Sequence, residues 1–124
     1  MIKGIGTDII DIKRVEAQIS NGSFMKRYFT QNELEYINIK ANPAESAAAV
    51  FSAKEAVSKA VGTGFRGFSP IDIEVLHDEL GKPYIKLSDK ALLFANSKNI
   101  KKFHLSLSHS KEYAVSYVIA EGDE

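Results

Sequence analysis

The acidic residues Asp8 and Glu55 are the strongest candidates for chemistry in this sequence of 124 residues. Asp8 follows two glycines in a β-branched segment, and Glu55 lies in the middle of an alanine-rich segment, so neither is placed like an ordinary surface charge. Mg²⁺ is typically held by one or two carboxylates together with substrate phosphates and water, so two separated acids suffice for a magnesium site. Two structural interpretations stay open: Asp8 caps a following helix, or Glu55 forms an exposed ion pair with Lys59.

The spacing around both acids indicates which faces they share. In a strand, the two glycines before Asp8 lie on its face, and glycine within strands often marks close approach of a ligand or another backbone. In a helix, Ser52, Glu55 and Lys59 form one polar stripe among small apolar residues. The stripe could face a site.

The glycine-rich segment Gly62–Gly67 is a candidate phosphate cradle, because it offers backbone amides and the Arg66 guanidinium. It is not a P-loop, which has Gly-Lys-Ser/Thr before its helix rather than glycines after one. The alternative interpretation is that Gly62, with Gly64 close behind, ends the preceding helix.

Among the three histidines, His109 has the most suggestive position, between two serines at a strand end where it can reach the rim of a pocket. The alternative is a strand-end histidine with satisfied hydrogen bonds. His77 and His104 have less context, and we expect both at the surface.

Basic residues gather near the amino terminus, in a pattern that would suit an acidic partner surface; a solvated face is the alternative interpretation. They are Lys13, Arg14, Lys26 and Arg27.

The hydrophobic pattern predicts the elements that position these residues. Helical periodicity and capping signals predict helices at residues 11–20, 30–42, 43–61 and 88–95. Alternating apolar residues predict strands at residues 2–10, 71–75, 84–87, 105–108 and 115–119, the last four as two hairpins. A single α+β domain over residues 1–124 fits this order best.

Composition narrows the functional classes. Lys plus Arg equals Asp plus Glu, so bulk charge gives no general attraction for nucleic acid or anionic membranes. Cysteine is absent, which excludes disulfides and thiolate metal sites and is compatible with a cytoplasmic address. The first residues are too short and interrupted for a signal peptide, and no apolar run approaches a membrane span.

Three motifs together resemble the holo-acyl-carrier-protein synthase family of phosphopantetheinyl transferases, in its small single-domain form. They are GIGTDIID at residues 4–11 with Arg14 and Glu16 after it, FSAKEAVSKA at 51–60 and LSHS at 107–110. The resemblance implies an α+β 4'-phosphopantetheinyl transferase fold and transfer of 4'-phosphopantetheine from coenzyme A to a serine of acyl carrier protein, in support of fatty acid biosynthesis. The other product is adenosine 3',5'-bisphosphate.

The same resemblance implies roles for particular residues. Asp8 and Glu55 would bind Mg²⁺ with the coenzyme A pyrophosphate and water, and water would replace the further acid that larger relatives carry at the position of Ile10. Lys59 would supply positive charge to a phosphate, and either Glu55 or a metal-bound water would take the serine proton. His109 would hydrogen-bond coenzyme A. The secondary contacts to coenzyme A would come from Gly62, Gly64 and Arg66.

The resemblance also implies partners. Arg14 would dock the acidic recognition helix of acyl carrier protein, and the active site would lie between the subunits of a homotrimer. Two alternatives from other classes remain, a non-catalytic coenzyme A or nucleotide-binding module and a metal-dependent phosphohydrolase. Magnesium-dependent turnover with a protein acceptor distinguishes the transferase from both.

Overall fold

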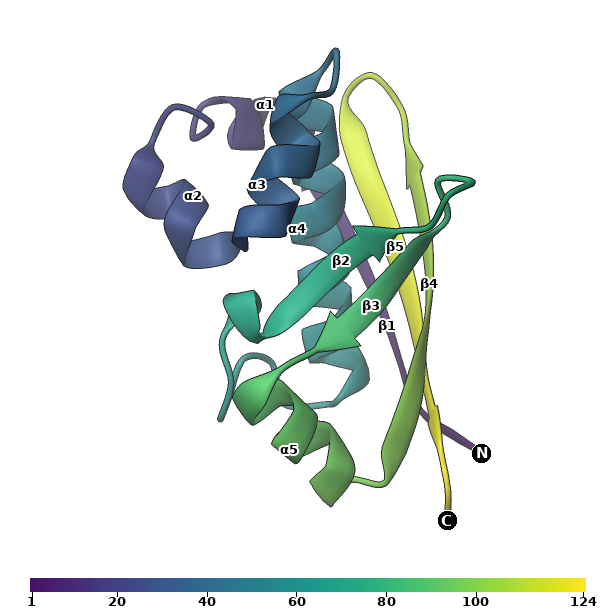
Figure 1. Cartoon of the computed structure of the whole chain (residues 1–124). Helices are drawn as coiled ribbons and strands as arrows, with labels where there is room; N and C mark the ends of the chain where they lie inside the picture. Colours follow the sequence, from purple (N-terminus) through teal and green to yellow (C-terminus); the bar gives the residue numbers. More distant parts are fainter.

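The computed structural model describes all residues from Met1 to Glu124 (Figure 1). The strands are β1 (Ile2–Asp11), β2 (Ile73–His77), β3 (Pro83–Leu87), β4 (Ile100–His109) and β5 (Tyr113–Gly122). The α-helices are α1 (Ile12–Glu16), α2 (Gly22–Tyr28), α3 (Gln31–Asn38), α4 (Pro43–Ala60) and α5 (Asp89–Ser97), and a short 3₁₀ helix covers Pro70–Asp72.

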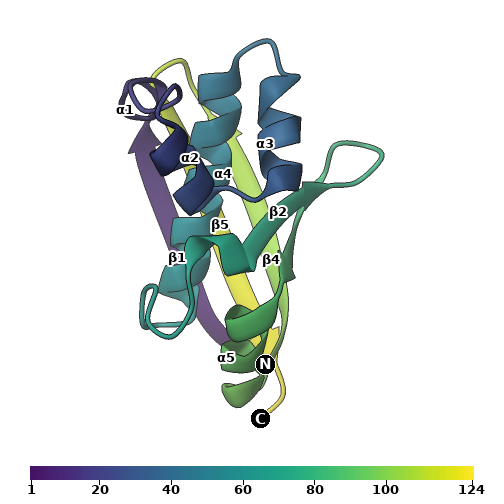
Figure 2. The same ribbon diagram turned by 60° about the vertical axis from the view of Figure 1, so that its left-hand side comes forward.

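The strands form two antiparallel sheets with α4 between them. β5 pairs with both β1 and β4 in a three-stranded sheet, and β2 pairs with β3 in a separate hairpin. Figures 1 and 2 show α1, α2 and α3 gathered near one end of α4, and α5 near the other end. The predicted α+β fold and both predicted hairpins are confirmed.

Several predicted boundaries were wrong. The helix expected at residues 11–20 is only α1, one and a half turns long, because the chain turns after Glu16. The helix expected to reach residue 42 ends at Asn38, and the strand expected at 105–108 already begins at Ile100. None of these shifts moves a candidate site residue out of its predicted element.

Helix α4 forms where its sequence signals predict. The Asn42 side chain accepts a hydrogen bond from the Glu45 backbone amide at 3.2 Å, and Pro43 occupies the first helical position. Ala47, Ala53 and Ala56 are fully buried, because the helix is enclosed by the large sheet, the β2–β3 hairpin and α3. A helix that is apolar on most sides is typical of a core position. None of the helices combines the length and apolar composition that a membrane span requires.

Two glycines let α4 lie directly on β1. A Cβ at Gly4 would come within 1.9 Å of the Ala60 carbonyl oxygen, and a Cβ at Gly6 within 2.0 Å of the Ala56 carbonyl oxygen. Two residues of a strand and four residues of a helix both span about 6 Å, so β1 and α4 stay in step along their contact. After Gly4 opposite Ala60 and Gly6 opposite Ala56, the next residue of β1 that faces α4 is Asp8. The predicted close approach of another backbone is therefore confirmed, and the backbone is that of α4.

The opposite face of the three-stranded sheet is uncovered in the single chain. Ile5 is 59% exposed and Ile9 64% exposed on β1, and Tyr117 is 44% exposed beside them on β5. The neighbouring positions on the other face, such as Ala114 and Val118, are fully buried. This uncovered face is an apolar surface without a partner in the chain.

Candidate active site

Asp8, Glu55 and Lys59 meet where β1 runs along α4. The Lys59 ammonium donates to Asp8 Oδ1 at 3.1 Å and to the Thr7 carbonyl oxygen at 3.0 Å. Lys59 therefore pairs with Asp8 across two elements, so the interpretation of Glu55 and Lys59 as a merely exposed helical pair does not describe the site. The Asp8 side chain is only 14% exposed, whereas that of Lys59 is 53% exposed.

The electrostatics of Glu55 reflect this meeting. Its partial burial raises the pKa of the carboxyl above the ordinary value of 4.5, the nearby charge of Asp8 raises it further, and Lys59 opposes both effects. Two carboxylates that repel each other in a partly buried place are stabilised by any cation that lies between them. The site is therefore electrostatically prepared for positive charge.

A hydroxyl pair fixes the backbone that carries Asp8. The Ser52 hydroxyl donates to the Asp8 carbonyl oxygen at 3.2 Å and lies 2.7 Å from the Ser116 hydroxyl, which donates in turn to the Ser52 carbonyl oxygen. Both serines are fully buried. The predicted polar stripe of α4 does face β1, but Ser52 is enclosed beneath the site and only Glu55 and Lys59 reach it.

The donor set at this site fits Mg²⁺. No group of three or more His, Cys, Asp or Glu side chains is arranged to hold a metal ion by itself. Asp8 and Glu55 offer hard carboxylate oxygens from two rigid elements, which is the number Mg²⁺ usually takes from protein when phosphates and water complete its shell.

The glycine-rich segment after α4 ends the helix. The Gly62 amide donates to the Lys59 carbonyl oxygen at 3.0 Å, and the Gly64 amide donates to the Ser58 carbonyl oxygen at 3.1 Å. Gly62 has φ of 87° and Gly64 has φ of 66°, conformations that favour glycine. The helix-ending interpretation is confirmed, and these two amides are already engaged. Arg66 is exposed on the same segment.

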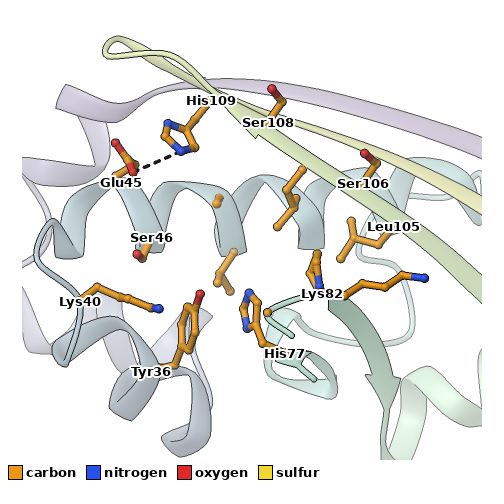
Figure 3. Close-up of a pocket in the computed structure, with 15 residues that line it drawn as sticks. Tyr36, Lys40, Glu45, Ser46, His77, Lys82, Leu105, Ser106, Ser108 and His109 are labelled. Carbon is orange, nitrogen blue, oxygen red and sulfur yellow. Dashed lines mark ion pairs between the residues drawn. The ribbon is translucent and has the colours of Figure 1, made fainter. Parts of the chain in front are cut away.

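His109 lies at a second place, a cavity of about 570 Å³ bounded by α3, α4, the β2–β3 hairpin and β4 (Figure 3). Its Nε2 is 3.4 Å from Glu45 Oε1. Lys40, Lys82 and His77 also line this cavity, which we call the basic pocket. The basic pocket thus holds two lysines, two histidines and a single carboxylate, that of Glu45. This balance of charge suits an anionic ligand.

The placement of His77 corrects the expectation that it lies at the surface. Its ring is half-buried and stacks on the ring of Tyr36, with centroids 4.0 Å apart and planes 7° from parallel, and Lys40 Nζ lies 4.6 Å from the Tyr36 centroid. Burial lowers the pKa of His77, and the charge of Lys40 lowers it further against the opposing effect of Asp78. The alternation of the strand could have predicted the partial burial of His77, because it shares a face with the buried residues Ile73 and Val75. His104 is exposed, as predicted, and pairs with Glu121.

A single chain does not bring His109 to Asp8 and Glu55. Glu45, which contacts His109, lies ten residues before Glu55 on α4, or about 15 Å along the helix axis. β5 lies between β1, which carries Asp8, and β4, which carries His109. The basic pocket and the acidic site are thus separated both along α4 and across the sheet.

Arg14 lies beside an aromatic cleft that the sequence analysis did not predict. This cavity of about 280 Å³ is lined by Arg14 with Phe24, Tyr28 and Phe51, among others. The ring centroids of Phe24 and Tyr28 are 4.9 Å apart, and those of Tyr28 and Phe51 are 5.1 Å apart. The helical spacing of Phe24 and Tyr28 was the available signal.

Comparison with known proteins agrees with this geometry. The family model for the 4'-phosphopantetheinyl transferase superfamily matches residues 4–118. The chain is 52% identical over 122 residues to the holo-[acyl-carrier-protein] synthase of Clostridium botulinum (strain Alaska E43 / Type E3), covering 98% of each chain. It is 48% identical over 120 residues to that of Fusobacterium nucleatum, covering 96% of this chain and 98% of the relative.

Solved structures show the same similarity. The crystal structure of the Neisseria meningitidis holo-[acyl-carrier-protein] synthase superposes with a TM-score of 0.90 at 36% identity, covering 98% of this chain and 99% of the other. A Bacillus anthracis holo-(acyl-carrier-protein) synthase in complex with CoA (3',5'-ADP) gives a TM-score of 0.83 at 41% identity, covering 99% of each.

The chain therefore belongs to the 4'-phosphopantetheinyl transferase superfamily. Its relatives over nearly their whole length are the small holo-[acyl-carrier-protein] synthases, and it is a phosphopantetheinyl transferase. The resemblance stated from the three motifs is confirmed.

Proposed function

We propose that this chain transfers the 4'-phosphopantetheine group of coenzyme A to a serine of an acyl carrier protein in a Mg²⁺-dependent reaction. The serine oxygen would form a bond to the β-phosphorus, the bond from that phosphorus to the bridging oxygen would break, and adenosine 3',5'-bisphosphate would leave. The observation that carries the proposal is the meeting of Asp8, Glu55 and Lys59 on two rigid elements of a chain similar to holo-[acyl-carrier-protein] synthases.

The acidic site supplies the chemistry in this proposal. Asp8 and Glu55 would hold Mg²⁺, which when bound neutralises charge on a diphosphate. Lys59 is half-exposed, and its ammonium, which contacts Asp8 and the Thr7 carbonyl oxygen, can turn toward a phosphate oxygen. Glu55 would accept the serine proton as the general base.

The basic pocket would bind the nucleotide end of coenzyme A, where phosphate charge is concentrated. Lys40, Lys82 and His109 offer positive or hydrogen-bonding groups, and the stacked rings of Tyr36 and His77 form a flat wall. A related synthase was solved with CoA (3',5'-ADP). We assign Arg66 a secondary contact; Gly62 and Gly64 would act by shaping the segment, since their amides are engaged.

Because one chain separates the basic pocket from the acidic site, we propose that a complete active site joins the pocket of one subunit to the acids of its neighbour in a homotrimer. The uncovered sheet face around Ile5, Ile9 and Tyr117 supports this, since a contiguous apolar surface on a folded chain is typical of an interface between subunits.

The acyl carrier protein would dock on α1 and α2. Arg14 is exposed beside the aromatic cleft, so the surface combines positive charge with an apolar hollow. Charge steers an acidic partner and the cleft can bury an apolar side chain from it. The smaller contacts of Lys13, Lys26 and Arg27 would add to the steering.

Intact-protein mass spectrometry tests the function. Apo acyl carrier protein is incubated with this chain, coenzyme A and Mg²⁺, beside samples with EDTA and with the Asp8→Asn variant. We expect a phosphopantetheine-sized gain on the serine that both controls lack. Release of adenosine bisphosphate without protein modification would instead indicate a phosphohydrolase. Intact coenzyme A and unmodified protein with several carrier proteins would indicate a binding module.

A further inference from the structure

The pair formed by Lys54 and Glu33 is the most deeply buried charged group in the chain. Lys54 Nζ lies 2.6 Å from Glu33 Oε1, and the two side chains are 1% and 0% exposed. Lys54 directly precedes Glu55 on α4, so it occupies the same motif as the acidic site. Nothing in the proposed chemistry uses it.

This pair ties four elements together. The Lys54 ammonium also donates to the Pro70 carbonyl oxygen at 2.9 Å, in the 3₁₀ helix. Glu33 Oε1 accepts from the Thr30 amide at the start of α3, and Glu33 Oε2 accepts from the Val75 amide of β2, both at 2.8 Å. We call this set of contacts the Lys54 clamp.

Burying an ion pair in a core costs free energy, because both charges lose their contact with water. Burial raises the pKa of Glu33 and lowers that of Lys54, and their mutual attraction opposes both shifts. Apolar residues of similar volume at such places are often neutral or stabilising. Conformational specificity is the best-attested gain from a buried pair, so the contacts of the pair indicate what it specifies.

The contacts of Lys54 on α4 indicate that the pair fixes the rotation of this helix about its axis. Successive helical residues point about 100° apart, so Lys54 and Ser52 leave the helix about 160° from each other. Ser52 bonds the Asp8 carbonyl oxygen on one side, and Lys54 bonds Glu33 and Pro70 on the other. The rotation of α4 is thus held from two opposite directions, and Glu55 lies between them.

The clamp also holds the segment that follows α4. Residues 61–69 leave the end of the helix and return at Pro70, whose carbonyl oxygen accepts from Lys54. One end of the segment is therefore continuous with the helix that carries Glu55 and Lys59, and the other end is bonded back to that helix.

We propose that Lys54 is a positioning residue, which through Glu33 and Pro70 fixes the orientation of Glu55 toward Asp8 and anchors residues 61–69 beside them. The catalytic part of this inference rests on the proposed function, whereas the anchoring part does not. Loss of the clamp would loosen residues 61–69 and slow turnover, even in a variant that stays folded.

Hydrogen–deuterium exchange and steady-state kinetics test the clamp together. The variants are Lys54→Met, the neutral pair Glu33→Gln/Lys54→Met, and a control Ile37→Val, which trims a fully buried core side chain of α3 and removes neither the ion pair nor any hydrogen bond of the clamp. We expect exchange in residues 61–69 to quicken at least about 10-fold in both clamp variants, with kcat falling about 10- to 100-fold, the range seen when groups that orient catalytic ligands are lost. The KM for acyl carrier protein should change little.

The control should lower the melting temperature while leaving exchange in residues 61–69 and kcat near those of the wild type. If Lys54→Met does not fold, the neutral pair, which leaves no buried charge unpaired, decides the matter by the same two measurements. A folded clamp variant with wild-type exchange and wild-type kcat would show that the pair is only structural. A wild-type chain without transferase activity would instead overturn the proposed function, and the exchange data would still decide the anchoring.

Discussion

The ion pair of Lys59 with Asp8 sets what the acidic site can bind. Lys59 is half-exposed, and exposed pairs of this kind contribute about 0–1 kcal/mol, so the contact is easily exchanged for another. Asp8 and Glu55 are held by the strand and the helix themselves. The carboxylates are therefore the fixed part of the site and the lysine its adjustable part.

Removal of either carboxylate tests this assignment. We expect Asp8→Asn and Glu55→Gln each to lower kcat by at least about 100-fold, because several kcal/mol of charge stabilisation is lost and each 1.4 kcal/mol or so is tenfold in rate. Circular dichroism should show an unchanged fold, since both substitutions keep side-chain size. Near-normal rates at saturating Mg²⁺ would contradict the metal assignment.

The proposed role of Arg14 predicts an effect on the binding of acyl carrier protein only. Arg14→Ala should raise the KM for acyl carrier protein about 5-fold, the effect of losing roughly 1 kcal/mol from a charge at an interface rim, with kcat nearly unchanged. The matched control is Lys86→Ala, an exposed lysine on β3. A change confined to coenzyme A affinity would place Arg14 elsewhere in the mechanism.

Because the pKa of His77 is lowered in the folded chain, we expect the free energy of unfolding to depend on pH. Its folded-state pKa lies below the ordinary value of 6.5, so as the pH falls the unfolded chain takes up a proton before the folded chain does. The stability is complete above the unfolded pKa and declines as the pH falls from there toward the lowered folded pKa. His77→Phe keeps a ring against Tyr36 and cannot titrate, so its melting temperature should fall less between about pH 7.5 and about pH 5.5. Equal falls in both proteins would argue against the shift.

At the scale of elements, the contact of β1 with α4 is the arrangement on which the acidic site depends. Gly4 and Gly6 let the Ala60 and Ala56 carbonyl oxygens lie where side chains would otherwise project. A larger residue in that row would push α4 away from the strand, and with it Glu55 and Lys59. The small residues of both elements are therefore a requirement of the site as well as of the core.

Gly6→Ala measures this dependence. The added Cβ would lie 2.0 Å from the Ala56 carbonyl oxygen, so the helix must move. We expect a loss of about 1–3 kcal/mol in the free energy of unfolding, as for other overpacked cores, and a fall in kcat. Gly22→Ala is the control, because a Cβ there meets nothing within 4 Å. Thermal melts and transfer rates of the two variants decide it, and an unaffected Gly6→Ala would mean that the contact can relax without cost.

At the scale of the whole molecule, the separation of the basic pocket from the acidic site is the main structural argument for assembly. His109 and Asp8 lie on the outer strands of the large sheet, with β5 between them. The exposed face of that sheet carries Ile5, Ile9 and Tyr117. An isolated chain therefore has both halves of a site and an apolar surface, and a trimer would account for both.

A charge on the uncovered face tests the trimer. Ile5→Glu should shift the chain toward monomers in sedimentation velocity, because a buried unpaired charge at an interface costs about 2–5 kcal/mol, or roughly 30-fold or more in the dissociation constant. Transfer activity should fall with the trimer fraction. Leu93→Glu, at a 70% exposed position on α5, should change neither. A wild-type chain that is monomeric at working concentration yet fully active would refute the shared site.

The sequence by itself predicted most of the elements and indicated which residues could form an acidic site. Strand alternation and helical spacing are local properties, so they place Asp8 and the pair Glu55 and Lys59 on known faces, and capping signals at Thr30 and Asn42 mark where helices begin. The motifs added the family. The predicted helix ends were less accurate, since they depend on what packs against the last turn.

The tertiary structure decided which distant residues meet. The burial of Ser52 beneath Asp8, the stack of His77 on Tyr36 and the pairing of Lys54 with Glu33 all join segments far apart in the chain. Spacing along one element fixes a direction but not the partner that lies there, because the partner follows from how helices and sheets pack around the whole core.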